Sequence, residues 1–481
     1  MKIPVAEQDL KKAFPAFLII TALILIAVWL FRDPTANFAA SVPGMDDRDK
    51  GMKIPPENIE IGEHFKVFDA PHDSLSESWP RFRGADFDNI SKSDVKLINQ
   101  FPENGPKILW KHELGEGHGG AAIYKGLVYI LDYDEDGRAD MLRCFNLLTG
   151  EELWRRWYKV KIKRNHGISR TVPAVTDDYI LTLGPRCHVM ATRRQDGEFL
   201  WGIDIEKEYN TESPLWYTGQ CPLIYDNEAV LAVGGKDLLI GVDMETGELK
   251  WKTPNPDSLQ MSHSSIIPFS FAGKDMFVYS AVGGLVGVSA EPEDRGEILW
   301  KTTEWDHSVV APSPVCMPDG KIMLSAGYGA GSMLLQLSEN GGDFSLQVLD
   351  EYKPAQGLSS EQQSFIYYKE RLFGILPKDA GANRNQLVCA NPDNPKEFVW
   401  TSGKTNRFGL GPYMIADDKI FFLNDDGTLF IAEASVSAYK QLDSYKLLDG
   451  HDAWAPLALT NGYMVLRDSK TMVCIDLNQI N

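Results

Sequence analysis

Short runs in which apolar and polar residues alternate recur along the chain, and several of them end in tryptophan. The run Gly150–Trp154 reads Gly-Glu-Glu-Leu-Trp, and residues 197–201, 247–251 and 296–300 have the same form. Each run begins at a turn such as Thr149-Gly150, where glycine takes a positive φ without the penalty of a Cβ. Alternation with a period of two after a turn predicts a β-strand. The chain is therefore expected to be rich in strands.

The tryptophans that end these runs are regularly spaced. Trp154, Trp201, Trp251 and Trp300 follow one another at intervals of about 50 residues, and Trp400 ends a further copy two intervals later. A fixed period of about 40–50 residues in a strand-rich chain is typical of a β-propeller with one four-stranded blade per repeat. A tryptophan on the outer strand can fill the wedge that opens between neighbouring blades.

The two ends of the repeat region predict how the ring closes. Ile108–Lys111 resembles the outer strand of a blade that lacks its other three strands. Three further strands are expected after the last complete blade, at residues 457–459, 463–466 and 472–475. Pairing the early strand with these three leaves no open sheet edge. We therefore predict an all-β, eight-bladed propeller over residues 107–481. Seven blades are the alternative, because the blades ending near Leu349 and Leu447 lack the tryptophan.

The segment Phe14–Phe31 is apolar and carries no charge. As a helix it would be roughly 27 Å long, which is enough to cross the apolar part of a bilayer. Lys11 and Lys12 precede it, which predicts a cytoplasmic N-terminus and an exported remainder. The alternative is a cleaved signal peptide, whose apolar region is usually shorter.

These features divide the chain into five parts. We expect a cytoplasmic N-terminus at residues 1–13, a transmembrane anchor at 14–31 and a linker at 32–78. A lead-in segment at 79–106, beginning with Trp-Pro-Arg-Phe-Arg-Gly, should pack across the propeller that follows it.

Composition narrows the possible functions. The 481 residues carry a net charge of −19, which argues against nucleic-acid binding because that needs a basic face. The six cysteines are far apart and form no C-x-x-C motif, which excludes covalently attached c-type haem and a zinc ribbon. Cys144, Cys389 and Cys474 occupy the repeat position of Gly241 and Gly287, so we expect small buried residues there rather than disulfides.

An acidic segment follows one of the expected strands. Asp132, Asp134, Asp136 and Asp140 lie at positions 1, 3, 5 and 9 of this segment, and Gly137 lies at position 6. Alternate carboxylates with a glycine that allows a sharp turn suit a hard cation such as Ca²⁺. The four aspartates are therefore predicted calcium ligands. The alternative is a metal-free acidic tip of a hairpin.

A second group of candidate residues lies just before the expected innermost strands. Because those segments of a propeller meet on one face around the central channel, their side chains should form a ring. Histidine, arginine and aromatic side chains together suit a small molecule or a peptide. The alternative is a polar lining that holds only water. The predicted ligand-binding residues are His118, His166, Arg170, Trp216, Tyr217, His263, His307, Arg407, His451 and Trp454.

The repeat resembles a known family of propellers. The segment Val242–Trp251 is similar to the pyrroloquinoline-quinone (PQQ) repeat, A-x-D-x-x-T-G-x-x-x-W, and the likeness extends over most of the chain. Two kinds of protein share this repeat. Quinoprotein dehydrogenases are enzymes, whereas the propeller lipoprotein of the bacterial outer-membrane barrel-assembly machinery binds a partner without a cofactor. The segment Trp79–Gly84 also looks like the start of many bacterial PQQ-like propellers of unassigned function.

The resemblance favours binding over catalysis for this chain. In the enzymes PQQ commonly packs against two adjacent cysteines and many of them carry a haem domain, and this sequence has neither. We therefore expect a scaffold or adaptor that is anchored in the bacterial cytoplasmic membrane, with its propeller in the periplasm and an envelope protein as its partner. PQQ is not expected, and Ca²⁺ is the one predicted cofactor. The alternatives are a PQQ-dependent oxidoreductase and a propeller that binds a small molecule or glycan in its funnel.

Overall fold

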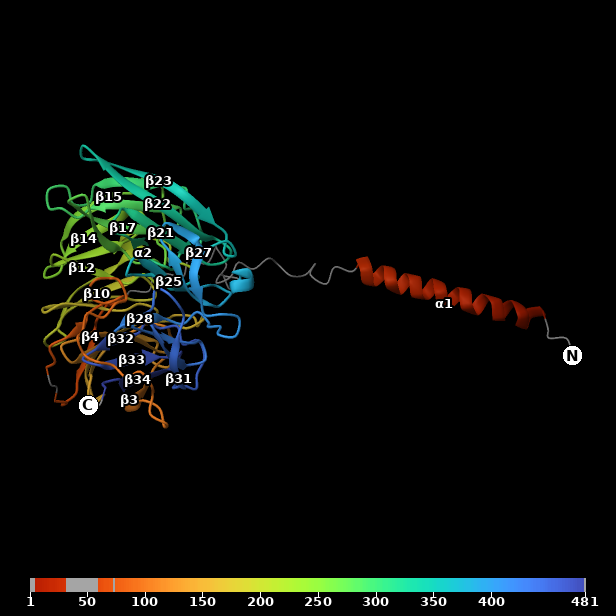
Figure 1. Cartoon of the computed structure of the whole chain (residues 1–481), viewed down its shortest axis with the longest axis horizontal. Coiled ribbons are helices and arrows are strands. Elements are labelled where there is room, and N and C mark those ends of the chain that lie inside the picture. Colours follow the sequence, from red (N-terminus) through yellow and green to blue (C-terminus); the bar gives the residue numbers. More distant parts are fainter. Residues whose placement is uncertain (1–4, 32–58, 72–73, 480–481) are drawn as a thin grey trace. The chain divides into compact units, whose positions relative to one another are not determined.

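The computed structural model describes residues 5–31, 59–71 and 74–479. They fall into two units, Met1–Pro55 and Pro56–Asn481. The first contains helix α1 (Val5–Phe31), shown in Figure 1. Its stretch Ala13–Phe31 has a mean hydropathy of 2.7 and is long and apolar enough to cross a membrane. An N-terminal signal sequence would have the same length and composition.

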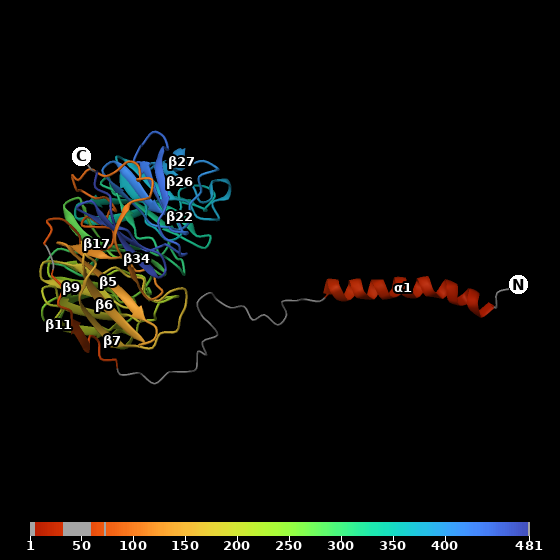
Figure 2. The same ribbon diagram turned by 90° about the horizontal axis from the view of Figure 1, so that it is seen from below.

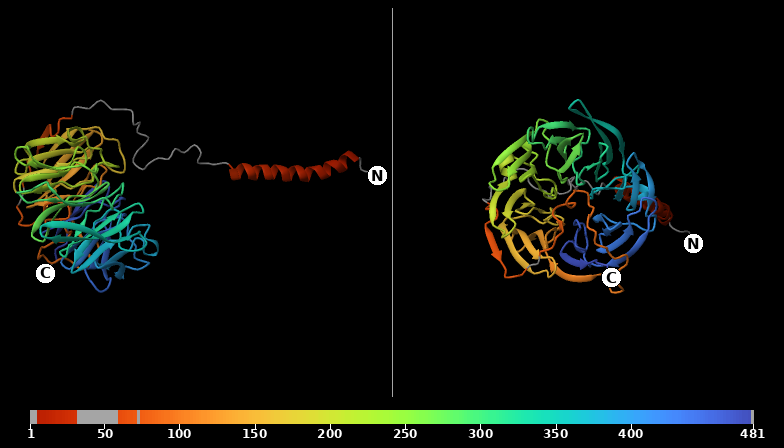
Figure 3. Two further views of the ribbon diagram at one scale, coloured as in Figure 1. Left: turned by 90° about the horizontal axis from the view of Figure 1, so that it is seen from above. Right: turned by 60° about the vertical axis from the view of Figure 1, so that its left-hand side comes forward.

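The second unit is a ring of eight antiparallel blades, which confirms the predicted eight-bladed propeller (Figures 1 and 3). Each blade has four strands, and the first gains two more. Helix in the described part of this unit is confined to α2 (Ile205–Tyr209) and the 3-10 turn η1 (Gly381–Asn383).

The first four blades follow one another along the chain, and strands β5 to β7 lie side by side in Figure 2. Blade 1 contains β4 (Ala122–Tyr124), β5 (Leu127–Asp134), β6 (Ala139–Asn146) and β7 (Glu152–Lys159). Blade 2 contains β8 (Ala174–Val175), β9 (Tyr179–Leu183), β10 (His188–Arg193) and β11 (Phe199–Asp204). Blade 3 contains β12 (Leu223–Tyr225), β13 (Glu228–Ala232), β14 (Asp237–Asp243) and β15 (Leu249–Pro254). Blade 4 contains β16 (Ile267–Phe271), β17 (Lys274–Ala281), β18 (Gly284–Ser289) and β19 (Ile298–Thr302).

The remaining four blades complete the ring. Blade 5 contains β20 (Val315–Cys316), β21 (Lys321–Ala326), β22 (Gly331–Asn340) and β23 (Asp343–Tyr352). Blade 6 contains β24 (Ile366–Tyr368), β25 (Arg371–Ile375), β26 (Leu387–Asn391) and β27 (Asn394–Thr401). Blade 7 contains β28 (Tyr413–Ala416), β29 (Lys419–Leu423), β30 (Thr428–Glu433) and β31 (Gln441–Lys446). Blade 8 contains β32 (Ala458–Thr460), β33 (Tyr463–Arg467), β34 (Thr471–Asp476) and the early strand β3 (Lys107–Glu113).

Strand β3 closes the ring as the sequence predicts. It pairs antiparallel with β34, and the register places Trp110 opposite Cys474. Ring closure therefore joins residues from the beginning and the end of the propeller in one sheet, and β34 gains the partner that its outer edge would otherwise lack.

The recurring glycine and tryptophan lock neighbouring blades together. A Cβ on Gly150 of blade 1 would come 2.4 Å from the ring of Trp110 in blade 8. The same contact recurs between Gly197 and Trp154, Gly247 and Trp201, and Gly296 and Trp251. Each of these glycines has a positive φ, so it satisfies the turn and also makes room for the tryptophan of the preceding blade.

The tryptophans also explain the small residues of the repeat. The register pairs Cys144 with Trp154 on the neighbouring strand, and Gly287 with Trp300 in the same way. All six cysteines of the chain lie in the described part and are free, and all but Cys316 are buried. These cysteines act as small apolar residues, which agrees with the prediction.

The hydrophobic core is repeated around the ring, because each blade packs its faces against its neighbours. Leu181 of blade 2 and Leu231 of blade 3 belong to one buried cluster. Leu334 of blade 5 and Leu372 of blade 6 belong to another. This arrangement leaves the loops at the channel free to carry a site.

The predicted linker at residues 32–78 needs correction at its C-terminal end. Residues 32–58 lie outside the described residues, but strand β1 (His64–Val67) pairs antiparallel with β7. Strand β2 (Ser78–Trp79) pairs with β4 on the other side of blade 1. The physical reason is that β7 and β4 are the edges of their sheet and offer free backbone groups for pairing.

The lead-in segment then crosses the ring (Figure 3, right). Arg83 Nη2 donates to the carbonyl oxygen of Phe365, just before blade 6, at 3.1 Å. Further on, the amide of Ser91 donates to the carbonyl of Ile415 in blade 7 at 2.8 Å. These contacts hold residues 79–91 between blade 1 and blades 6 and 7.

Candidate functional site

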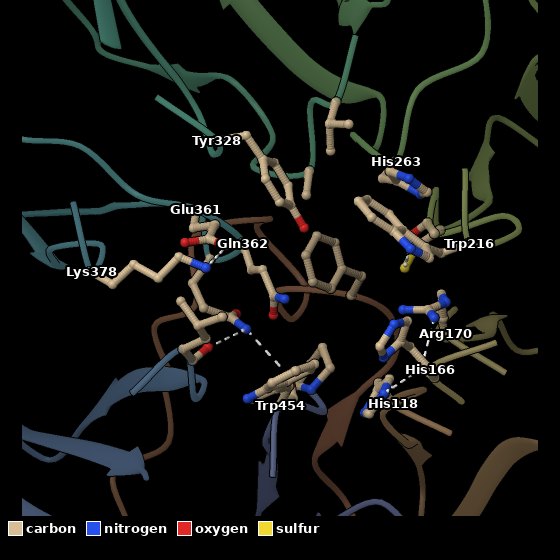
Figure 4. Close-up of a pocket in the computed structure, with 18 residues that line it drawn as sticks. His118, His166, Arg170, Trp216, His263, Tyr328, Glu361, Gln362, Lys378 and Trp454 are labelled. Atoms are coloured by element: carbon tan, nitrogen blue, oxygen red, sulfur yellow. Dashed lines mark hydrogen bonds and ion pairs between the residues drawn. The ribbon is translucent and has the colours of Figure 1, made fainter. Parts of the chain in front are cut away.

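A cavity of about 380 Å³ lies where the loops of the ring converge (Figure 4). Its lining includes residues that precede the innermost strand of every one of the eight blades. Those segments converge because all innermost strands run alongside the channel. The lining residues are Phe82, His118, His166, Arg170, Trp216, Gly219, Cys221, His263, Val309, Ala311, Tyr328, Glu361, Gln362, Gln363, Lys378, Leu410, Trp454 and Pro456.

The structure brings six of the ten predicted ligand-binding residues together around this cavity. They are His118, His166, Arg170, Trp216, His263 and Trp454. These six residues meet at the cavity because each lies just before an innermost strand. That they bind a ligand remains a prediction.

Two other predicted residues lie behind or beside the cavity. Tyr217 is buried, and its hydroxyl donates to the carbonyl oxygen of Lys163 at 2.6 Å. His307 lines a separate, smaller cavity and lies 4.3 Å from the ring of Trp305. Tyr217 directly follows Trp216 and packs beside Tyr133 and Tyr158, away from the cavity lining.

The last two predicted residues lie outside the cavity lining. Arg407 donates to the carbonyl oxygens of Lys404 at 3.0 Å and Ala382 at 3.1 Å. His451 is exposed and pairs with Asp452 at 3.0 Å. The structure does not bring these two residues to the cavity, because the loops before the innermost strands differ in length and conformation and do not keep one register.

Arg170 is the charged group on one wall of the cavity. Its Nη2 donates to the carbonyl oxygens of Asn165 (3.1 Å), His166 (2.7 Å) and Gly167 (3.2 Å), while Nε is buried without a hydrogen-bond partner. Among the described residues no acidic side chain pairs with it. Burial lowers the pKa of Arg170 to about 10, so it stays protonated at neutral pH. Arg170 is only partly buried, but it loses part of its hydration there, and an anionic ligand would replace that lost interaction.

Two histidines beside Arg170 are uncharged at neutral pH. Burial, followed by the charge of Arg170, lowers the pKa of His118 and of His263 to about 3. His118 Nε2–H donates to the carbonyl oxygen of His166 at 2.8 Å, and its Nδ1 is buried without a partner. These two rings therefore offer neutral polar atoms and add no positive charge.

Aromatic rings line the cavity between Arg170 and the facing wall (Figure 4). The ring of Trp216 lies 5.6 Å from that of Tyr328 and 6.2 Å from that of His263, with interplanar angles of 24° and 27°. The ring of Trp454 lies 5.0 Å from that of His118. Such offset rings present flat, electron-rich surfaces.

Three lining residues have a strained backbone. His166, Trp216 and Tyr328 have φ values of 51°, 61° and 57°. Bulky residues avoid this left-handed region, which costs about 1–3 kcal/mol each and is concentrated at functional sites. The strain fixes three large side chains at the cavity.

The facing wall is polar and comes mainly from blade 6. The Glu361 carboxylate lies 3.8 Å from Lys378 Nζ, and burial raises the pKa of Glu361. Gln363 Nε2 donates to the carbonyl oxygen of Trp454 at 3.3 Å. Figure 4 shows Gln362 between this wall and that of Arg170. Because blades 2 and 6 lie opposite each other in a ring of eight, the unpaired Arg170 lies at one end of the cavity, and the Glu361–Lys378 pair lies with polar side chains at the other.

Sequence reasoning missed Phe82, Tyr328, Glu361, Gln363 and Lys378. Phe82 belongs to the lead-in motif Trp79–Gly84. Glu361 and Gln363 lie just before an innermost strand, the position that predicted other lining residues. The sequence therefore contained a signal for Phe82, Glu361 and Gln363. Tyr328 and Lys378 lie in loops that follow the C-terminal ends of β21 and β25. Nothing in the repeat marks those two positions.

The predicted calcium ligands are not brought together. Tyr133 pairs with Asp140 in the β5–β6 hairpin, so Asp140 lies on the opposite face from Asp132 and Asp134. Asp132 Oδ2 instead lies 3.0 Å from Arg143 Nη1. In the part of the chain that the structure describes, no three His, Cys, Asp or Glu residues are grouped to hold a metal.

The reason is that residues 132–140 form a regular hairpin rather than an open loop. Asp134 accepts from the amide of Gly137 at 2.8 Å, and Asp136 is exposed at the turn. Asp140 is buried and accepts from the Tyr158 hydroxyl at 2.7 Å. Calcium binding stays a prediction for which the structure assembles no site.

The cavity is a poor match for PQQ. That cofactor is flat and carries three carboxylates, whereas the cavity offers one guanidinium without an acidic partner and places Glu361 opposite it. Cys221 is the single cysteine among the described lining residues, so no adjacent cysteine pair meets the cavity.

Comparison with known proteins agrees with the fold. The family model described as outer membrane protein assembly factor BamB matches residues 101–265. BamB from Moraxella catarrhalis is 11% identical with a TM-score of 0.50, covering 77% of this chain and 99% of that one. A europium-containing methanol dehydrogenase is 11% identical with a TM-score of 0.58, covering 81% and 89%. Quinohemoprotein alcohol dehydrogenase from Comamonas testosteroni is 10% identical with a TM-score of 0.57, covering 84% and 81%.

No curated protein sequence matches the chain. At identities near 10% the solved structures show the fold alone, and they include both a BamB protein and dehydrogenases. By its repeat and its fold the chain is thus similar to the PQQ-repeat propellers, the superfamily of BamB-like proteins and quinoprotein dehydrogenases.

Proposed function

We propose that this protein is a membrane-anchored propeller that binds a small molecule in its central cavity. The observation that carries the proposal is Arg170, a partly buried guanidinium that lines the cavity without an acidic partner among the described residues. Arg83 and Arg467 are also buried without an acidic partner in the described part of the chain, but they bind carbonyl oxygens away from the cavity lining, whereas Arg170 lies on the lining. A ligand that supplies the anion explains why the cation is kept.

Two further observations support a built site. The strained backbones of His166, Trp216 and Tyr328 hold three large side chains at one wall. The cavity has the concave shape and mixed aromatic and polar lining of small-molecule sites.

The proposed place of action is the outer side of the bacterial cytoplasmic membrane. Helix α1 would serve as the anchor, and Lys11 and Lys12 before its apolar stretch favour an N-terminus inside. The propeller and its cavity would then face the periplasm.

A second candidate function is that of a scaffold for an envelope protein. The match of residues 101–265 to the BamB family model favours it. Exposed apolar side chains on outer strands of blades 3, 5 and 6, Leu249, Leu349 and Val399, would provide contact surface. The two functions can coexist, because the outer strands and the cavity are different parts of the ring.

The test is recovery of the ligand from the protein. The full chain would be purified in mild detergent from the envelope of its own host, then denatured, and the released compounds identified by mass spectrometry. Wild type should release one compound in near-stoichiometric amount, and Trp454→Ala should release much less.

Trp157→Ala is the matched control, because Trp157 lies on the outer strand of blade 1 and is not a lining residue. It should release as much as wild type. A wild-type protein that releases nothing contradicts the proposal, and a stoichiometric protein partner recovered in its place would support the scaffold.

A further inference from the structure

We infer that the ligand of the central cavity is an acidic sugar, a hydroxylated ring that carries one carboxylate. The inference rests on the proposed function and adds the chemical class of the ligand. The two ends of the cavity differ in charge and in hydrogen-bonding groups, and aromatic rings lie between them.

The Arg170 end fits one carboxylate. A guanidinium donates N–H bonds to a carboxylate, and Arg170 lines the cavity without an acidic partner among the described residues. Its Nη2 is fixed by three carbonyl oxygens, so the group is already oriented. His118 and His263 beside it are neutral. The second cation of the described lining, Lys378, is paired with Glu361, so the one unpaired cation matches a single negative charge better than the two charges of a phosphate.

The opposite end fits hydroxyl groups. Glu361 accepts hydrogen bonds, and the amides of Gln362 and Gln363 both donate and accept. A hydroxyl also donates and accepts, so a hydroxylated ligand can bind Glu361 and Gln362, whereas Gln363 Nε2 is already held by the carbonyl oxygen of Trp454 at 3.3 Å. A flat aromatic acid would leave these groups unpaired after displacing their water, which is costly.

The rings between the two ends fit the C–H face of a sugar. Trp216, Tyr328 and Trp454 expose π surfaces to the cavity, and these attract the weakly positive hydrogens of an aliphatic ring. The cavity volume of about 380 Å³ lies at the small end of the range for ligand sites. A mono- or disaccharide is therefore the expected size.

The experiment is a calorimetric titration of the full chain in detergent micelles with matched sugars. D-glucuronate and D-glucose share a ring and differ in the carboxylate, and D-galacturonate and D-galactose form a second pair. Each acid should bind at least tenfold more tightly than its neutral partner. PQQ and D-glucose 6-phosphate are included as competing anions and should bind more weakly than the preferred acid.

Variants assign the preference to its residues. Arg170→Gln should abolish the difference between acid and neutral sugar, and Arg170→Lys should retain part of it. Glu361→Gln should weaken both members of a pair. Arg407→Gln is the control, because Arg407 is an arginine of the same face outside the cavity, and it should bind like wild type. Thermal melting of each variant distinguishes a loss of ligand binding from a loss of the folded structure.

Three results would overturn the inference. They are equal binding of acid and neutral sugars, an unchanged preference in Arg170→Gln, and tight binding of PQQ or the phosphate without the sugar acids. The third leaves the cavity as a ligand site, whereas a failure of the proposed function would appear as a wild-type protein that releases no compound on denaturation.

Discussion

Asp140 shows how one buried carboxyl can govern the pH dependence of this propeller. It lies on the inward face of the β5–β6 hairpin, where one oxygen accepts from Tyr158 and the other has no partner. Burial, with a smaller contribution from the charge of Asp132, raises the pKa of Asp140 to about 7. The native protein thus retains a proton that an unfolded chain releases near pH 4.

We predict that Asp140→Asn stabilises the protein increasingly as the pH rises. Between about pH 4 and pH 7 the native state binds more protons at this site than the unfolded state, so the wild type loses stability as the pH increases. Asparagine stays neutral and avoids this loss, which is on the order of a few kcal/mol. In thermal melts from pH 4 to pH 8, the melting temperature of the variant should rise relative to that of the wild type.

Asp136→Asn is the matched control, because Asp136 is exposed at the tip of the same hairpin. Its melting temperature should follow that of the wild type at every pH. An Asp140→Asn variant that is less stable than the wild type at pH 8 would refute the assignment of a raised pKa.

At the same scale, part of the site could be predicted and part could not. His118, Arg170 and Trp454 were found because they precede innermost strands and the repeat fixes where such residues meet. Lys378 belongs to a loop outside that register, so its approach to Glu361 depends on the folded path of the chain. The arrangement of the four aspartates could not be predicted, because the sequence shows spacing and not which face of a hairpin a side chain occupies.

At the scale of elements, the repeat tryptophan joins one blade to the next. Trp110 on β3 packs against Gly150, and its Nε1–H donates to the carbonyl oxygen of Leu147 in blade 1 at 2.7 Å. Since β3 also completes blade 8, this residue connects the first blade to the last.

Trp110→Ala should therefore lower the free energy of unfolding by about 3–5 kcal/mol, the usual loss for a buried tryptophan. Ile108→Ala, on the same strand but half exposed, should change it by less than about 0.5 kcal/mol. Urea denaturation followed by circular dichroism measures both. A similar small effect in the two variants would show that the closing strand does not depend on its tryptophan.

The elements also show where pattern reasoning ends. Pairing of β3 with the last three strands followed from counting repeats, because a missing fourth strand had to come from elsewhere. Strand β1 could not be found in this way. Its four residues contain neither the glycine turn nor the tryptophan of the repeat. They form a strand because β7 has an unpaired edge.

For the whole molecule, the ring converts local repeats into a single site. Eight loops that are far apart in the sequence meet at one cavity, and the lead-in segment supplies Phe82 to its lining. The arrangement places Arg170 and Glu361 on opposite blades, so the ligand should span the channel. The fold followed from the repeat alone, whereas the polarity of the cavity required the structure.

The most direct test is a crystal structure of the protein soaked with the sugar acid that binds most tightly. The account predicts density in the central cavity, with the carboxylate within hydrogen-bond distance of Arg170 and the hydroxyls toward Glu361 and Gln362. An empty cavity at saturating concentration, or density with the carboxylate directed away from Arg170, would contradict it.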